Sequence, residues 1–491
     1  MNYILGIDIG TGSTKAVGVG LDHAAFASSQ YFYPTTASLP GYSEQDPELI
    51  WQAFQQSIND VVQQIGADPL TISLSSAMHS LIAIDENSKP LAPMMTWADS
   101  RSADIAEQLL SSSLGTALYR LTGTPIHAMS PLCKLIWIRE NQPELFKRTF
   151  KFISIKEYIW FKLFGTYECD YSIASCTGLM ELEKLAWSDE ALTVAGITVE
   201  QLSTLVPTTC VRRDFDYNTL PFLGQETTFV IGASDGCLAN LGTGAIQPGM
   251  AALTIGTSGA LRVANDHAVF NEKAMTFSYL LDEHIYINGG PINNGGIALK
   301  WHLKNMLNKD ELDEADYNDA FNKVEKVDAG ADGLIFLPYL QGERAPIWDA
   351  KSCGTFFGIG LKHHRQHFTR AVIEGVCYAL NDVLQSLVAS GQQIDQLNVS
   401  GGFVSSPVWL QTLADITGKK LVLASTEDAS AVGAAYLAMK ATGLSSAYPL
   451  PELTESRTIL PVEVNHIAYQ GYFKVYKKLY SSLKELMHEL K

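Results

Sequence analysis

The sequence has few cysteines and no motif that would pair them. Its seven cysteines stand singly, and no two are spaced as C-x-x-C. An odd number of scattered thiols argues against a disulfide framework and against a zinc site, and it is typical of a reducing compartment. We therefore expect a cytoplasmic protein.

Clusters of positive charge are also lacking. The chain has 35 Lys and Arg against 52 Asp and Glu, a net charge of −17, and no basic run stands out. A surface of this sign repels nucleic acid and anionic membranes, so we expect neither as a partner. An anionic ligand would have to be held by local groups, such as backbone N–H groups, a metal ion or a few cations.

Long apolar runs and low-complexity segments are absent as well. No apolar run approaches the roughly 18 residues of a membrane span. The first strand, "NYILGIDIG", follows no basic segment with a cleavage site, so we expect no simple export signal. The apolar share of 46% and charged share of 18% are typical of a soluble enzyme. A length of 491 residues predicts two to four domains.

One motif occurs twice in the chain. "YILGIDIGTGSTKAV" (3–17) predicts a strand, a Gly-Thr turn and a second strand, and "AALTIGTSGALRV" (251–263) repeats this pattern. A repeat near the midpoint favours two large halves. We predict domains at 1–245 and 246–491, joined by the Gly- and Pro-containing link "GTGAIQPG".

Strands and helices alternate along both halves, which predicts α/β layers. In the first half, we expect a helix over 46–65 with Asp46 as N-cap, a strand over 70–78, and an insertion from about 96 to 221. A strand, a turn holding Asp235 and a helix follow over 227–242. The second half predicts further elements: a strand at 285–296 that leads into a helix, a helix at 367–389, a strand at 397–403, a helix from Pro407 capped by Ser405 or Ser406, and a final helix at 466–490.

The repeated turn could bind phosphate. Glycine lets a ligand approach the backbone closely, and Thr and Ser add hydroxyl groups. The turn is neither a Walker A loop nor a Rossmann fingerprint, because it lacks the G-K-[ST] ending and runs into a strand. A single turn of this kind is more often only structural, but two like domains would place two such turns on opposite walls of one cleft. Thr254 stands in the second repeat at the position that Asp8 has in the first. Only the first repeat therefore has a carboxylate suited to binding the Mg²⁺ of a nucleotide.

Several segments, in order along the whole chain, resemble those of the FGGY carbohydrate kinases, which belong to the actin/hexokinase/Hsp70 superfamily. They are "LGIDIGTGSTK" (5–15), "MSPLCKLIWIREN" (129–141), "VIGASDG" (230–236), "GTFFGIGLKHHRQHFTRAVIE" (354–374) and "SGGFVSSP" (400–407). The resemblance implies an α/β fold of two ribonuclease H-like, actin-like ATPase domains, duplicated and facing across a central cleft. It also implies ATP and Mg²⁺ as cofactors.

Within the family, the sequence is most similar to the gluconate kinases, in "SSAMHSLIAIDENSKPL" (75–91), "TWADSRS" (96–102) and "GGPINNGG" (289–296) among other segments. This implies transfer of the γ-phosphoryl group of ATP to the 6-hydroxyl of D-gluconate. Xylulose kinases share Met78-His79 and the "GERxP" pattern at 342–346, so a xylulose kinase or another FGGY sugar kinase is the alternative. A non-catalytic, actin-like sugar sensor is an alternative of another class, against which the presence of Asp8 and Asp235 argues.

The resemblance also implies roles for individual residues. Asp235 is the expected general base, kept ionised by the N-terminus of its helix, although an Asp in this place can also be only an N-cap. Asp8 and Asp235 are expected to hold Mg²⁺. The expected nucleotide contacts are Asp8, Gly10, Thr11, Ser13, Thr14 and Lys15 in the first half, and Gly256, Thr257, Gly296, Gly402, Phe403 and Ser406 in the second. Ser406 could instead do no more than cap its helix.

The sugar pocket is expected around Met78, His79, Trp97, Arg101, Met129 and Asp235. A sugar acid needs a cation or several donors for its carboxylate, and the sequence leaves this open among Arg101, His127, Lys134 and Lys156. The expected partners are a small-molecule sugar acid and ATP. The sequence leaves open whether the protein forms a homodimer.

Overall fold

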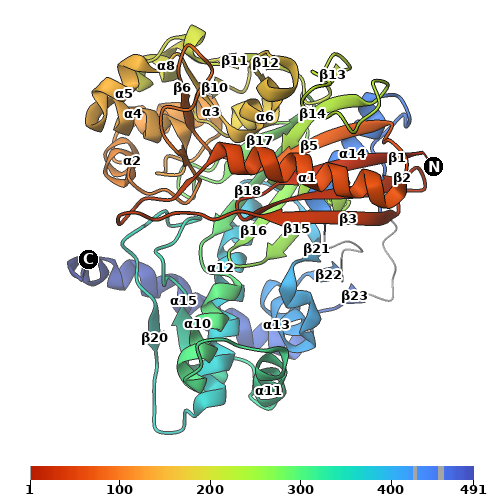
Figure 1. The fold of residues 1–491 in the computed structure, drawn as a ribbon. Coiled ribbons are helices and arrows are strands. Elements are labelled where there is room, and N and C mark those ends of the chain that lie inside the picture. Colours follow the sequence, from red (N-terminus) through yellow and green to blue (C-terminus); the bar gives the residue numbers. More distant parts are fainter. Residues whose placement is uncertain (1, 424–427, 452–457, 491) are drawn as a thin grey trace. The chain divides into compact units, whose positions relative to one another are not determined.

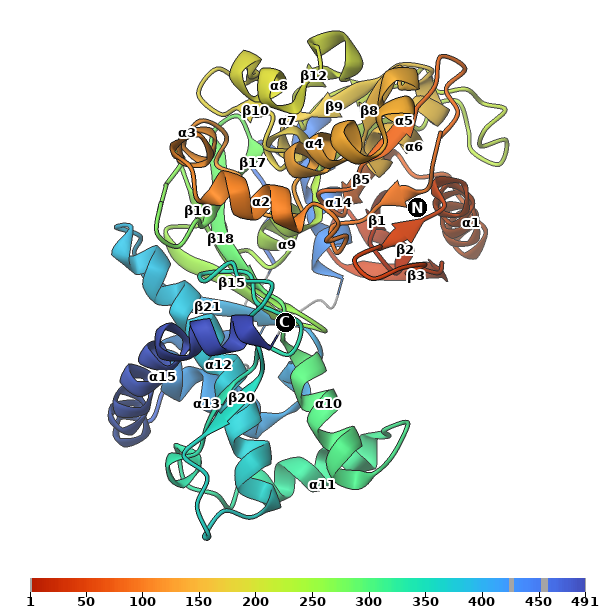
Figure 2. The same ribbon diagram turned by 90° about the vertical axis from the view of Figure 1, so that its left-hand side faces the viewer.

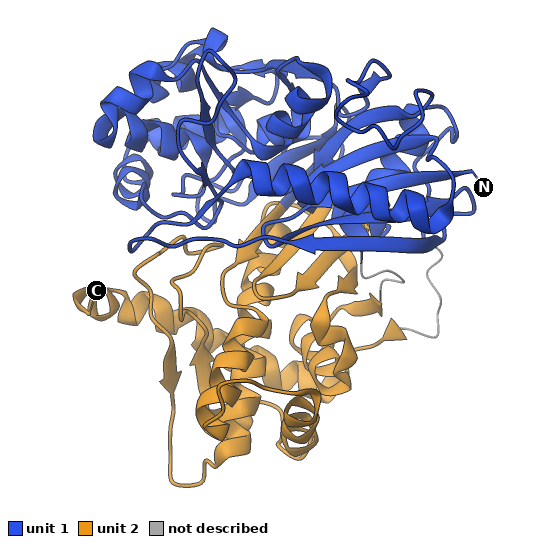
Figure 3. Cartoon of the chain, in the orientation of Figure 1, with its two compact units in different colours: residues 1–244, 264–288, 428–451 blue, residues 245–263, 289–427, 452–491 orange. Residues whose placement is uncertain are grey.

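The chain divides into two compact units in the computed structural model, which describes residues 2–423, 428–451 and 458–490. The first unit comprises 1–244, 264–288 and 428–451, and the second comprises 245–263, 289–427 and 452–491 (Figure 3). The first change of unit, after Gly244, lies one residue from the predicted boundary. The sequence did not indicate that two later segments belong with the first unit.

A six-stranded sheet forms the centre of the first unit, in the order β13-β14-β5-β1-β2-β3 (Figure 1). Its strands are β1 (Tyr3–Ile9), β2 (Ser13–Gly20), β3 (Ala25–Phe32), β5 (Thr71–Ser76), β13 (Val211–Arg212) and β14 (Thr228–Ser234). The predicted hairpin is confirmed as β1 and β2, which are antiparallel. Both β1 and β14 run parallel to β5, so the carboxyl ends of these three strands meet at one edge.

The helix predicted over 46–65 is confirmed as α1 (Pro47–Ile65), which packs against β2 and β3. The Asp46 side chain accepts a hydrogen bond from the backbone N–H of Glu48, and Gly66 ends the helix in the left-handed conformation at φ 71°. Ile50 and Phe54 of this helix lie in one core cluster with the odd-numbered β1 residues, Tyr3, Leu5, Ile7 and Ile9. The core cluster that includes α1 thus covers one face of β1.

The other face of β1 is covered by α14 (Ala429–Ala441), which the sequence analysis did not predict. Three glycines let backbones approach here. A Cβ on Gly6 would lie 1.9 Å from the carbonyl oxygen of Ala431, and one on Gly433 would lie 2.0 Å from that of Leu238 in α9 (Asp235–Gly242). A Cβ on Gly242 would meet the Ala429 oxygen at 1.9 Å. Only residues without a side chain fit at these contacts.

The expected insertion is a mixture of helices and short strands. Its elements are β7 (Met94–Met95), α2 (Ala103–Leu110), α3 (Ser113–Thr122), α4 (Pro131–Asn141), α5 (Pro143–Arg148), β8 (Lys151–Ile153), α6 (Ile155–Phe164), β9 (Glu168–Asp170), α7 (Tyr171–Ser175), β10 (Met180–Glu181), β11 (Ala186–Trp187), α8 (Asp189–Ala195) and β12 (Thr204–Val206). Two short strands, β4 (Glu44–Gln45) and β6 (Ile82–Ile84), pair with β7 and β8.

The second large sheet has the order β17-β18-β16-β15-β21-β22-β23. Its strands are β15 (Gly249–Ile255), β16 (Gly259–Asn265), β17 (Phe277–Asp282), β18 (Ile285–Ile292), β21 (Ile394–Ser400), β22 (Lys420–Leu423) and β23 (Thr458–Ile459). The repeated hairpin is confirmed as β15 and β16, and β15 runs parallel to β21. Strand β17 and the first half of β18 belong to the first unit.

The helices of the second unit are α10 (Gly296–Leu307), α11 (Glu314–Val324), α12 (Arg365–Ala389), α13 (Pro407–Thr417) and α15 (Glu463–Glu489). Two short strands, β19 (Ile335–Leu337) and β20 (Thr355–Phe357), pair with each other. Helix α12 packs against α10 and α13 (Figure 2). It is long and apolar enough to cross a membrane, but 83% of its most apolar 18-residue window is buried inside the fold, as in the core helix of a globular domain.

Candidate active site

The two predicted carboxylates lie at the carboxyl ends of β1 and β14, the strands on either side of β5 in the first unit. Asp8 is near the end of β1, and Asp235 follows β14 directly as the first residue of α9. Burial raises the pKa of Asp8 to about 7, and the negative charge of Asp235 is the next largest cause. Asp428 raises this pKa further, while a hydrogen bond from the Ser75 hydroxyl at 2.8 Å and the charge of Lys15 oppose it. The fold thus brings Asp8 and Asp235 within electrostatic reach of one another.

Asp235 is not the N-cap of α9, because Ser234 occupies that position. The Asp235 Oδ1 atom accepts a hydrogen bond of 2.6 Å from the backbone N–H of Gly236. A carboxylate in the first turn of a helix is stabilised in its charged form by the exposed N–H groups there. Asp235 has this position at the start of α9, and its role as general base stays a prediction.

The polar groups of the first hairpin turn have partners within the unit. The Ser13 hydroxyl accepts a hydrogen bond from the Gln30 amide at 2.7 Å, and the buried Thr14 hydroxyl lies 3.3 Å from the hydroxyl of Tyr33. Lys15 forms an ion pair with Asp428, which directly precedes α14. The turn is therefore held in one conformation by residues that are distant in sequence.

In the second unit, the repeated turn lies against the start of α10. Gly256 and Thr257 are exposed, and their carbonyl oxygens accept hydrogen bonds from the backbone N–H groups of Gly296 (2.7 Å) and Ile297 (3.2 Å). The structure thus brings Gly256, Thr257 and Gly296 together, and their contact with a nucleotide stays a prediction.

The segment after β21 lies beside this turn, because β21 and β15 are parallel neighbours. Gly402 is exposed, but Phe403 is buried and packs edge-on against Trp409. Ser406 is 1% exposed and caps α13 by accepting a hydrogen bond from the Trp409 N–H at 3.3 Å. Of the two serines that the sequence offered as N-cap, the structure uses Ser406.

The predicted sugar residues follow β5 and line the insertion. Met78 is partly exposed, while His79 is 8% exposed with φ at 66°. The Nδ1 atom of His79 lies 2.8 Å from the Cys176 carbonyl oxygen, which orients the ring. Met129 is buried, and its N–H donates to Nδ1 of His127 at 3.1 Å.

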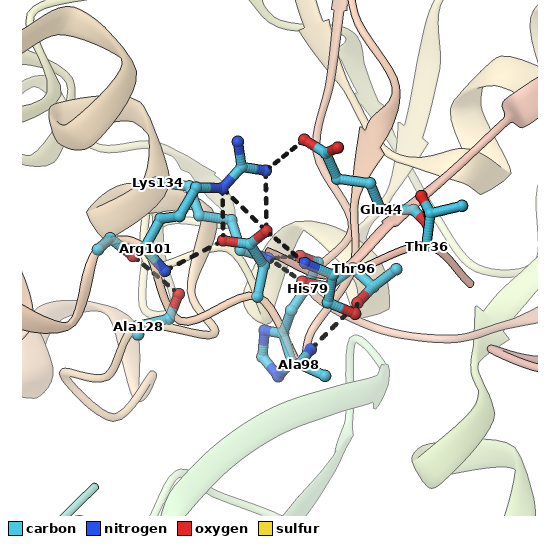
Figure 4. A network of polar contacts seen from close by, with 11 residues as sticks. Thr36, Glu44, His79, Thr96, Ala98, Arg101, Ala128 and Lys134 are labelled. Atoms are coloured by element: carbon cyan, nitrogen blue, oxygen red, sulfur yellow. Dashed lines mark hydrogen bonds and ion pairs between the residues drawn. The ribbon is translucent and has the colours of Figure 1, made fainter. Parts of the chain in front are cut away.

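A buried lysine joins the two segments that carry His79 and Trp97 (Figure 4). The Lys134 ammonium group donates to the carbonyl oxygens of His79 at 2.5 Å and of Thr96 at 2.7 Å. Its side chain is fully buried, and burial lowers its pKa to about 7. The sequence indicated Lys134 only as a candidate cation for the substrate, since no local pattern shows which carbonyl groups it contacts.

Two of the other three candidates for the substrate carboxylate, Arg101 and Lys156, also have intramolecular partners. Arg101 forms ion pairs with Asp99 (2.8 Å) and Glu44 (2.7 Å), and it stacks over Tyr42 at 3.8 Å. Lys156 and Asp170 form a pair at 2.7 Å in which both side chains are 1% exposed. Both cationic side chains are therefore engaged in ion pairs that help to stabilise the insertion.

Comparisons with known proteins agree with this arrangement. The models of the FGGY family of carbohydrate kinases match residues 3–242 with the N-terminal domain and 251–442 with the C-terminal domain. The gluconokinase of Bacillus licheniformis is 44% identical over 452 residues, 90% of this chain and 88% of that protein. The crystal structure of gluconate kinase from Lactobacillus acidophilus has a TM-score of 0.94 and 34% identity, and that of a xylulose kinase from the same species has 0.95 and 33%; each covers all of both chains. The chain belongs to the FGGY family of carbohydrate kinases, and it has their two-domain, actin-like ATPase fold.

Proposed function

We propose that this kinase transfers the γ-phosphoryl group of ATP to the 6-hydroxyl of D-gluconate, giving 6-phospho-D-gluconate. The observation that carries the proposal is the placement of Asp235 at the first turn of α9, within electrostatic reach of Asp8 at the end of β1. The substrate is argued from the gluconate-kinase-like segments and from the identity of 44% to a protein named gluconokinase.

Asp235 acts as the general base in this proposal. Phosphoryl transfer to an alcohol needs an acceptor for the hydroxyl proton and an aligned, charge-neutralised phosphate chain. A carboxylate held ionised at a helix N-terminus supplies the acceptor. In the first unit, the proposed phosphate contacts are Thr11, Ser13 and Lys15, whereas the side chain of Thr14 is fully buried and contacts Tyr33. In the second unit, the proposed nucleotide contacts are Gly256, Thr257, Gly296 and Gly402.

Asp8 and Asp235 are the residues that would hold Mg²⁺. The pKa of Asp8 is raised in part by Asp235, so the two carboxylates repel one another, and a divalent cation would relieve this repulsion. The donor set fits Mg²⁺, which binds one or two carboxylates and completes its shell with water and phosphate oxygens. When bound, Mg²⁺ neutralises charge on the phosphates.

A sugar panel tests the proposal. The purified protein is assayed at steady state with ATP and with D-gluconate, D-xylulose and glycerol. We expect kcat/KM for D-gluconate to exceed that for each of the others by more than tenfold. The high similarity to a solved xylulose kinase makes D-xylulose the second candidate. A preference of more than tenfold for D-xylulose would overturn the choice of substrate.

A further inference from the structure

A hydrogen bond joins the segment expected to contact the sugar to the first phosphate turn. The indole Nε1–H of Trp97 donates to the Thr11 hydroxyl oxygen at 2.9 Å. Thr11 lies between β1 and β2, and its carbonyl oxygen accepts a second hydrogen bond from the Gln45 amide at 2.5 Å. Gln45 is held in turn by the Thr35 hydroxyl at 2.8 Å. Thr11 is therefore fixed through its main chain and its side chain.

The chemistry of the Trp97 indole and the Thr11 hydroxyl determines which of them donates in this hydrogen bond. An indole N–H can only donate, whereas a threonine hydroxyl has one proton and two lone pairs. The hydroxyl of Thr11 must therefore accept from Trp97 and direct its own proton to another acceptor. Thr11, Met78 and Trp97 line the same small cavity, so residues predicted for the phosphates and for the sugar meet there.

The position of Trp97 does not depend on Thr11 alone. The preceding residue, Thr96, is held by the buried Lys134 ammonium through its carbonyl oxygen at 2.7 Å, and its hydroxyl lies 2.7 Å from that of Ser43. Loss of the indole donor should therefore leave the segment in place while releasing the Thr11 hydroxyl to rotate.

We propose that Trp97 is a positioning residue that acts through Thr11. The indole N–H holds the hydroxyl in the orientation in which it donates its proton to an oxygen of the phosphoryl group being transferred. A sugar acid lying against the Trp97 ring restrains the indole and thereby the donor. The inference rests on the proposed kinase site and adds to it a link between sugar occupancy and phosphate alignment.

A double-mutant cycle tests the link. Trp97→Phe keeps an aromatic ring and removes the donor, and Thr11→Val removes the hydroxyl at nearly constant volume. We expect each to lower kcat about tenfold, the free-energy equivalent of about 1.4 kcal/mol. KM for the sugar should change less than threefold. The double variant should be no slower than either single one, because both remove the same interaction.

Two further variants separate this role from a loss of packing. Thr11→Ser restores the hydroxyl and should keep kcat within threefold of the wild type. Trp187→Phe is the matched control, since its indole donates to the Ser203 carbonyl at the same distance of 2.9 Å elsewhere in the insertion; it should leave kcat unchanged. Thr11→Ala replaces Thr11→Val if that variant does not fold, as judged by circular dichroism.

The inference is overturned if the two single effects multiply in the double variant, or if Thr11→Ser is as slow as Thr11→Val. The cycle is measured with whichever sugar the wild-type enzyme phosphorylates best. A wild type that prefers another sugar would therefore contradict the proposed substrate and leave the cycle as a separate test of the link.

Discussion

The contact between β1 and α14 predicts that Gly6→Ala strongly destabilises the first unit. The added methyl group would lie 1.9 Å from the Ala431 carbonyl oxygen, whereas side-chain carbons rarely approach closer than 3.0 Å. One backbone would have to move by about 1 Å, within a sheet and helix packed at native density. Overpacking a core costs about 1–3 kcal/mol, and here neither side can rotate away. We expect a loss of about 3 kcal/mol or more, which lowers the melting temperature by about 6–12 °C.

Thermal and urea unfolding followed by circular dichroism measure this effect. The matched control is Gly471→Ala in α15, where a Cβ meets nothing within 4 Å. That substitution should be neutral or stabilise its helix by about 1 kcal/mol, because alanine favours helix over glycine. If Gly6→Ala unfolds within 1 kcal/mol of the wild type, the close approach of the two backbones is refuted.

Three other variants address the chemistry and the electrostatics. Asp235→Asn should lower kcat by about 10²-fold or more, because the proton acceptor is lost, while calorimetric titration still detects ATP binding; near-normal turnover would remove Asp235 from its role. Burial raises the pKa of Glu343 to about 7, so the folded state binds this proton more tightly, and the free energy of unfolding should fall as the pH rises from about 4.5 to 7. Glu343→Gln keeps an oxygen that can accept the same two backbone hydrogen bonds but does not titrate. Urea unfolding of this variant at pH 5 and pH 8 should therefore show no such fall in the free energy of unfolding; an unchanged pH dependence would contradict the raised pKa of Glu343. Lys134→Met deprives the carbonyl groups of His79 and Thr96 of their donor and should lower kcat/KM for the sugar about tenfold or more, with a smaller change in KM for ATP; wild-type sugar kinetics would show that this lysine does not position the pocket.

Local signals in the sequence were sufficient for the elements that place the site. The two Gly-Thr hairpins, the cap of α1 at Asp46 and the strand-to-helix turn at Asp235 are all set by residues adjacent in the chain. Glycine turns, capping side chains and apolar spacing act over a few residues, so they can be recognised without the fold.

Contacts between distant residues could not be predicted in this way. The ion pair of Lys15 with Asp428 joins residues 413 positions apart, and Lys134 meets carbonyl groups that lie 38 and 55 positions away. Strand β3 was missed because most of its side chains are exposed and it lacks an alternating apolar pattern. Helix α14 was missed because it is apolar on all sides, with small residues that give no face to recognise.

The return of residues 428–451 to the first unit has a consequence for biosynthesis (Figure 3). Most of this unit leaves the ribosome early, but the helix that covers one side of its central sheet is translated close to the end of the chain. Until α14 is translated, the face of β1 that carries Gly6 is uncovered. Exposed apolar surface of this kind makes a nascent chain prone to aggregation. We expect a gene cut at the predicted midpoint to leave the amino-terminal product without this helix, so that this half would not fold as an independent module.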